Sequence, residues 1–279
     1  MSNALLVYLN VSMWSARKLD KSATHEVTEN HAASSDAGRF NKQLLAKEAL
    51  APITQIASAA RTYLYDNTRP WGDNGDRIMT ITNYFIVPER LRQFKAEFNA
   101  AADVLEATYT EQRERSRLRL NTLFHDSDYP QAHEIRRKFS MDYGIMPVPT
   151  AGDFRVDLPE SALEEARTEI EKTVNARMNE AMSAVWEEVR GTVSKLRQRL
   201  EETRNGGRLH ESTLTNIEDL IARLPGLNLT NDAGLENMRK LLATTFNGIE
   251  MKDIKKSDAV RMDVMVQTDA IMKQMAGMV

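Results

Sequence analysis

Basic side chains gather in the middle of the chain, beside aromatic side chains, in a combination that suits single-stranded nucleic acid. Cations hold phosphate groups while aromatic rings stack on bases. The aromatic residues are Tyr129, Phe139 and Tyr143, and the candidate nucleic-acid-binding residues are Arg113, Arg115, Arg117, Arg119, Arg136, Arg137 and Lys138. Residues 111–140 hold seven Lys or Arg against five Asp or Glu. So small a surplus is equally typical of a solvated helix face whose charges pair internally, and both interpretations stay open.

Histidine and acidic side chains lie between the two basic groups, where imidazole and carboxylate ligands would suit a metal ion. They are His125, Asp126, Asp128, His133 and Glu134. Their spacing matches no standard zinc motif, and a proline interrupts the series. A solvated turn between helices explains the same residues, so we expect no metal site.

Methionine is concentrated near the end of the sequence. Residues 251–279 hold six of the 14 methionines. Because methionine is flexible and polarizable, it suits surfaces that adapt to a partner. We therefore predict partner-binding residues at Met262, Met265, Met272 and Met275. The alternative is an ordinary terminal helix docked on its own core or on a second subunit.

Catalytic motifs are missing from the sequence. The chain has no cysteine, which excludes a thiolate nucleophile, a thiolate metal site and a disulfide scaffold. It contains no GxSxG, HExxH or paired-carboxylate motif. The stretch TRPWGDNGD, residues 68–76, lacks the Lys-Ser/Thr of a phosphate loop and predicts a hairpin with Trp71 packed at its base. We expect a protein that is not an enzyme and that needs no cofactor.

The composition is that of a globular protein. The 279 residues include 37 Lys or Arg and 40 Asp or Glu, for a net charge of −3, and 42% are hydrophobic. This apolar fraction excludes general disorder, and the near-neutral balance argues against a protein that coats DNA. The apolar residues 5–9 lack the preceding cations of a signal peptide, and no apolar run reaches the roughly 18–20 residues that span a bilayer. We expect a cytoplasmic protein with no membrane partner.

The first part of the sequence predicts a mixture of strand and helix. Alternating apolar residues over 5–14 and apolar residues over 78–87 predict strands. The polar residues 15–40 predict a loop or a weak helix. Residues 41–66 have helical periodicity, although Pro52 should kink or restart that helix.

Two long amphipathic stretches follow, at 88–125 and 159–205. The apolar residues of the second recur about every 3.7 positions, which predicts a straight seam instead of a left-handed supercoil. We expect the two helices to fold back on each other as an antiparallel hairpin. Shorter helices at 211–224 and 232–246 flank a break at Pro225-Gly226.

The sequence thus predicts a mainly α fold, with a long helical hairpin or coiled-coil stalk and a small N-terminal α+β region. Its predicted divisions are 1–87 for that region, 88–207 for the stalk, and 208–279 for the short helices and the Met-rich tail. A stalk of this length leaves apolar surface that a second copy or a partner would cover, so we expect a homo-oligomer.

Three patches in this order resemble a family of phage and prophage proteins described as domain of unknown function 3150. They are LNVSMWSARKL near the N-terminus, NYFIVPERLRQF at the start of the first long helix, and EIRRKFSMDYGIMPV before the second. The resemblance covers most of residues 5–245. It implies a phage-encoded protein of the host cytoplasm whose partner is an AAA-type ATPase or a host protein. It implies no active-site residue.

Two functions stay open at this stage. The first is a non-enzymatic phage protein that oligomerises and engages a phage or host protein, in DNA metabolism or in host takeover. The alternative is a single-stranded DNA-binding or annealing factor that uses the basic residues named above.

Overall fold

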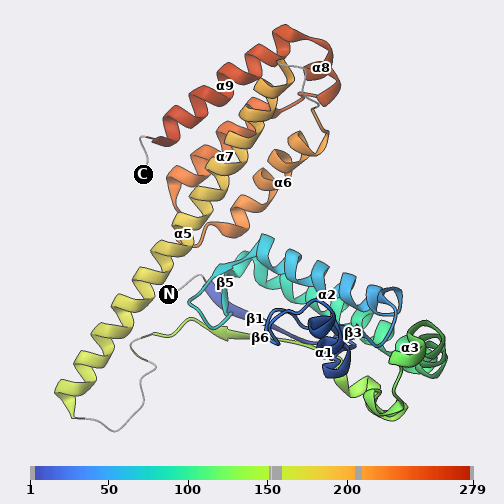
Figure 1. Cartoon of the computed structure of the whole chain (residues 1–279). Coiled ribbons are helices and arrows are strands. Elements are labelled where there is room, and N and C mark those ends of the chain that lie inside the picture. The colour runs from blue at the N-terminus through green and yellow to red at the C-terminus, as the bar shows by residue number, and fades with distance from the viewer. Residues whose placement is uncertain (1–3, 151, 153–158, 205–208, 277–279) are drawn as a thin grey trace. The chain divides into compact units, whose positions relative to one another are not determined.

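The computed structural model in Figure 1 describes residues 4–150, 152, 159–204 and 209–276, and it is mainly helical. One small sheet has the strand order β4-β5-β1-β6, and β2 and β3 form a separate antiparallel pair. The strands are β1 (Ala4–Ser12), β2 (Arg17–Leu19), β3 (Asn41–Gln43), β4 (Arg69–Pro70), β5 (Arg77–Thr80) and β6 (Ser140–Pro147). In the antiparallel pairing of β1 with β5, Ala4 lies opposite Thr80.

The α-helices of the described residues are α1 (Lys21–Asn30), α2 (Lys47–Asn67), α3 (Val87–Leu120), α4 (Ala132–Ile135), α5 (Glu160–Arg204), α6 (Ser212–Leu227), α7 (Ala233–Phe246), α8 (Met251–Lys256) and α9 (Asp258–Ala276). Short 3-10 helices are η1 (Ile81–Phe85), η2 (Asn121–Leu123), η3 (Asp126–Asp128) and η4 (Arg136–Lys138). None of the described helices is long and apolar enough to cross a membrane.

The chain forms two compact units, each with its own hydrophobic core. The first contains residues 1–8, 65–87 and 145–279, and the second contains residues 9–64 and 88–144. This division differs from the predicted boundaries at 87 and 207, and residue 207 itself lies outside the described residues.

The core of the first unit is built around α5. This helix packs along α9 and α6, and α6 packs in turn on α7 (Figure 1). Its buried face lies in its second half and consists of Ala181, Met182, Val185, Val189, Val193, Leu196 and Leu200. Residues 160–180 of the same helix are only half-buried or exposed. The apolar stripe predicted over 159–205 is therefore covered along part of its length.

The second unit has a core to which α2 and α3 both contribute. Its buried side chains include Ile53 and Ala57 of α2 and Phe98 and Tyr109 of α3. The Tyr109 hydroxyl donates to the Pro130 carbonyl at 2.9 Å, which fixes the chain after α3. The predicted hairpin of the two long helices is not confirmed, because α3 buries its apolar stripe in this core whereas α5 contributes to the other.

A buried lysine ties the start of the second unit to the segment after α3. The Lys42 ammonium lies 2.9 Å from the Asp20 carboxylate and 2.6 Å from that of Asp128, and Lys18 also pairs with Asp128 at 2.7 Å. Lys42 also donates to the Leu123 carbonyl at 3.0 Å. Asp20 is at the same time the N-cap of α1. Within the polar residues 15–40, β2 and α1 form and residues 31–40 belong to no helix or strand, so the predicted loop or weak helix is confirmed in part.

Three sequence predictions about element boundaries are wrong. The helix predicted at 41 begins at Lys47, since residues 41–43 form β3, and it runs through Pro52 without restarting. The strand predicted over 78–87 ends at Thr80, where η1 begins. The break expected at Pro225-Gly226 lies inside α6, which ends at Leu227. The predicted hairpin at 68–76 is confirmed by the antiparallel pairing of β4 with β5, and Trp71 is buried at its base.

Candidate interaction surface

The 3-10 helix η1 turns the chain sharply at the end of β5, in the first unit. The side chain of its N-cap, Thr80, accepts a hydrogen bond from the Asn83 backbone N–H at 3.3 Å. The Ile86 N–H donates back to the Asn83 carbonyl at 3.1 Å. Thr80 and Asn83 thus give the backbone local hydrogen-bond partners. These compete with the hydrogen bonds of a strand ladder, so β5 ends here.

Two buried side chains anchor this turn to the end of α6. The Thr80 hydroxyl and the Asn83 side-chain amide both donate to the Gly226 carbonyl, each at 3.0 Å. The same amide donates to the Asn67 carbonyl at 2.9 Å. A Cβ at Gly226 would lie only 2.3–2.8 Å from three side-chain atoms of Asn83. The absence of a side chain at residue 226 is therefore what lets η1 approach α6.

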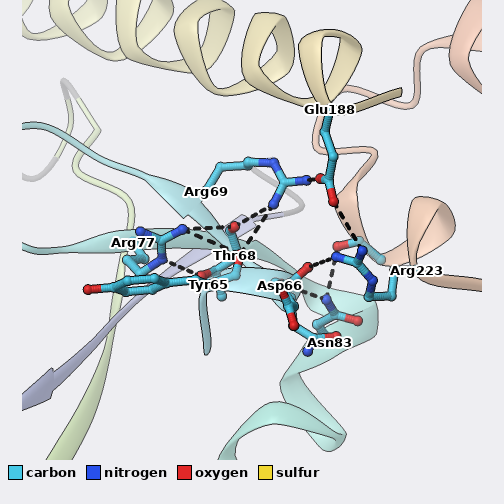
Figure 2. Close-up of polar contacts among 10 residues, drawn as sticks. Tyr65, Asp66, Thr68, Arg69, Arg77, Asn83, Glu188 and Arg223 are labelled. Carbon is cyan, nitrogen blue, oxygen red and sulfur yellow. Dashed lines mark hydrogen bonds and ion pairs between the residues drawn. The ribbon is translucent and has the colours of Figure 1, made fainter. Parts of the chain in front are cut away.

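Arginines from three segments surround carbonyl groups at the end of α2 and just after it, as Figure 2 shows. Arg69 Nη1 and Arg77 Nη2 donate to the Thr68 carbonyl at 2.8 and 3.1 Å. Arg223 Nη1 donates to the Asp66 carbonyl at 2.7 Å. The end of a helix leaves carbonyls without helical partners and carries a partial negative charge, so cations are favourable there.

One carboxylate links these arginines to α5. Glu188 accepts from Arg69 and, at 3.0 Å, from Arg223 (Figure 2). Burial lowers the pKa of Arg69, and the Glu188 charge opposes that shift. Burial likewise lowers the pKa of Arg77 to about 10, which leaves this guanidinium protonated at neutral pH. The network therefore holds the segment from residue 65 to η1 against α5 and α6.

The same turn presents apolar side chains to solvent. We call Ile81, Tyr84, Phe85 and Ile86 the 81–86 surface; their exposed fractions are 45%, 42%, 75% and 56%. The rings of Tyr84 and Phe85 meet edge to face with centroids 5.3 Å apart. Single exposed apolar residues are ordinary, but four on one rigid turn are typical of a binding surface.

The predicted nucleic-acid-binding arginines of α3 are paired in the structure. Arg113 and Arg117 both contact Asp126, at 2.7 and 3.0 Å. Arg115 pairs with Glu111 at 2.5 Å. Arg119 donates to the Gln43 carbonyl at 2.5 Å. These contacts match the internally paired face that the sequence left open.

The second basic group is only partly paired. Arg136 contacts Asp103 at 2.5 Å and donates to the Asn99 side chain at 2.9 Å. Arg137 and Lys138 form no ion pair within the described part of the chain. Of the seven predicted residues, four therefore contact acids, Arg119 contacts a carbonyl, and Arg137 and Lys138 remain without an ion pair among the described residues.

The candidate metal ligands are also occupied or dispersed. Asp126 binds two arginines and Asp128 binds two lysines, as described above. Among the described residues, no group of three or more His, Asp or Glu side chains could hold a metal ion.

The predicted partner-binding methionines divide between core and surface. Met265 and Met275 are buried in the core of the first unit, and Met272 is half-buried against it. Only Met262 is exposed, at 45%. Because α9 packs along α5, Met265 and Met275 fill the interior, as the alternative of a terminal helix docked on its own core predicts, while Met262 remains exposed.

Sequence reasoning missed the 81–86 surface because its apolar residues fit a strand. The signal that would have identified it is Thr80 followed three residues later by Asn83, a local capping pattern. No protein-family model, curated protein or solved structure matches the chain. The resemblance to the phage family therefore stays a prediction.

Proposed function

We propose that the chain is a non-enzymatic interaction protein that self-associates through the 81–86 surface. The observation that supports this most strongly is the row of exposed apolar side chains on η1. Asn83 and Thr80 hold the turn in place before any partner arrives. A preformed surface with an aromatic pair loses little conformational entropy on binding, which favours association.

The surface is large enough for a weak contact. A fully exposed aromatic side chain offers about 150–250 Å², so the four residues together expose on the order of 400–500 Å². Two copies would bury roughly twice this area, about 800–1,000 Å², which is below the range of stable interfaces and within that of weak, transient contacts. We therefore expect a micromolar dissociation constant rather than a nanomolar one.

Charge favours a second copy as the occupant. A twofold contact places each residue near its own copy, so any charge at the centre would face a like charge. The segment TITNYFI, residues 80–86, contains no charged residue. The only long polar side chain that this segment exposes is that of Tyr84, whose hydroxyl can donate or accept a hydrogen bond across such an interface.

The identity of a further partner rests on the resemblance alone. It implies that the assembled protein engages a phage or host protein, such as an AAA-type ATPase, in the host cytoplasm. A single-stranded DNA-binding function has less support, because five of the seven candidate cations contact acids or carbonyl groups of the same unit.

Sedimentation velocity over a range of protein concentrations tests self-association. We expect the wild type to shift from monomer to dimer with rising concentration and Phe85→Ser to stay monomeric. Val266→Ser is the matched control, since Val266 is an apolar residue of α9 with 63% exposure. A wild type that stays monomeric up to about 100 µM contradicts the proposal, as does equal loss in both variants.

A further inference from the structure

A surface pocket of about 520 Å³ lies in the second unit, between α1 and the segment that follows it. Its lining residues are Leu19, Lys21, Thr24, His25, Thr28, Ser35, Gly38 and Arg39. Four of them, at positions 21, 24, 25 and 28, share one face of α1 because of their helical spacing. The volume falls within the range of small-molecule sites.

The lining of this pocket is basic. Lys21, His25 and Arg39 line it, and no acidic residue does. Neither Lys21 nor Arg39 forms an ion pair with any described residue, whereas His25 lies 3.4 Å from Glu29 on its own helix. Two of the lining cations are therefore available to an anion.

The aspartates nearest in sequence are engaged elsewhere. Asp36 accepts from the Ser34 hydroxyl, and this hydrogen bond lowers the pKa of that carboxyl. Asp20 accepts from the Ala23 N–H and pairs with Lys42. Because both carboxylates have partners outside the pocket lining, neither neutralises Lys21 or Arg39 within it.

Hydrogen bonds hold the walls of the pocket in place. The Phe40 N–H donates to the Thr24 hydroxyl at 3.0 Å, and the Asp20 N–H donates to the Phe40 carbonyl at 2.9 Å. The segment after α1 is thus tied to the helix. Ser35 has no hydrogen bond within the described residues, so its hydroxyl is free to donate to a bound ligand.

We propose that this pocket binds a phosphate monoester. A phosphate dianion matches the two unpaired charges of Lys21 and Arg39, and its oxygens accept from the Arg39 fork and from Ser35. A carboxylate would use only part of this donor set. The phosphate can belong to a free small molecule or to the 5′ end of a nucleic acid, since both present the same group.

Titration calorimetry at low ionic strength tests the pocket in the full chain. The probes are inorganic phosphate, adenosine monophosphate, and a short DNA oligonucleotide with and without a 5′ phosphate. We expect the phosphate monoesters to bind, and Arg39→Gln to weaken their binding at least about tenfold, since it removes charged hydrogen bonds. Arg92→Gln is the control: this arginine of the same unit is exposed, lies outside the pocket and is not a candidate nucleic-acid-binding residue, so its variant should bind as the wild type does.

Three results would overturn the proposal: no binding of any probe, equal weakening in the two variants, or oligonucleotide binding that does not depend on the 5′ phosphate. Tighter binding of the phosphorylated oligonucleotide than of the mononucleotide assigns the pocket to nucleic-acid ends, and the reverse order assigns it to small molecules. Lys21→Gln provides a second variant if Arg39→Gln does not fold, and thermal unfolding shows which variants are folded.

Discussion

At the scale of single residues, Gly226 decides whether the 81–86 surface forms. Two buried side chains of the turn converge on its carbonyl, and Asn83 occupies the space that a Cβ would need. Glycine inside the last turn of a helix is usually a weakness, because it lowers helix propensity. Here the missing side chain is what allows η1 to lie close to α6.

We predict that Gly226→Ala destabilises the protein by about 1–3 kcal/mol, because the new Cβ overpacks against Asn83. Urea unfolding measures the change. Gly191→Ala is the matched control, since a Cβ there meets nothing within 4 Å. That variant should be more stable than the wild type by about 0.5–1 kcal/mol, because alanine is the better helix former. Equal midpoints for the two variants would contradict this account.

The Lys42 cluster gives the second unit a dependence on pH. A backbone hydrogen bond from Ala23 and the contact with Lys42 lower the pKa of Asp20. Burial raises the pKa of Asp128, but hydrogen bonds from Lys18 and Lys42 outweigh it and leave that pKa lowered. A carboxylate with a lowered pKa in the folded state stabilises the fold above its unfolded pKa of about 4. This stability is lost as the pH falls through the folded value.

We predict that Asp128→Asn lowers stability at pH 7 by about 1.5–3 kcal/mol, as expected for loss of charged hydrogen bonds. The difference from wild type should shrink as the pH falls below about 4, because Asp128 in the unfolded wild type then takes up a proton, and it should be lost once the pH is below the lowered pKa of the folded state. Urea midpoints at several pH values measure it, with the exposed Asp73→Asn as control. A difference that stays constant from pH 7 to pH 3 would refute the role of this carboxylate.

At the scale of elements, α5 has two halves with different energetic roles. Leu196 is 1% exposed in the core, whereas Leu163 in the first half is only half-buried. We predict that Leu196→Ala lowers the free energy of unfolding by about 2–5 kcal/mol and that Leu163→Ala lowers it by less than about 1 kcal/mol. Denaturation midpoints compare them directly. Similar losses would mean that both halves of the helix are packed alike.

Periodicity located the long helices well but not their partners. The stripe over 159–205 predicted α5 to within a residue at each end, because a helical repeat of apolar residues depends only on local spacing. Which helix covers that stripe depends on contacts distant in sequence. The Met-rich helix α9 packs on α5, where residues 88–125 were predicted to pack. Its Met265 and Met275 side chains are buried in the same core as the apolar stripe of α5.

The candidate site was harder to predict than the fold. Polar residues separate some of the apolar residues Ile81, Tyr84 and Ile86, and an edge strand would show the same pattern. Hydrogen bonds from Asn83 to Asn67 and Gly226 decide the outcome, and those partners are 16 and 143 residues away. The local capping pattern at Thr80 indicates where the strand ends, but it does not indicate these distant contacts.

At the scale of the whole molecule, the account rests on self-association. The predicted reason for an oligomer was a long stalk with an uncovered seam, whereas the proposed self-association depends on an uncharged apolar turn. The absence of cysteine offers a direct way to locate the contact, because a single introduced thiol can pair only with its copy.

Oxidation of Thr82→Cys is the measurement that tests this claim most directly. Thr82 is exposed between Ile81 and Asn83 and is not one of the apolar contacts, so its replacement leaves the 81–86 surface intact. The account predicts a disulfide-linked dimer that forms readily at micromolar concentration, while Thr244→Cys, an exposed position of α7, stays monomeric. Equal cross-linking of the two variants, or none in either, would contradict it.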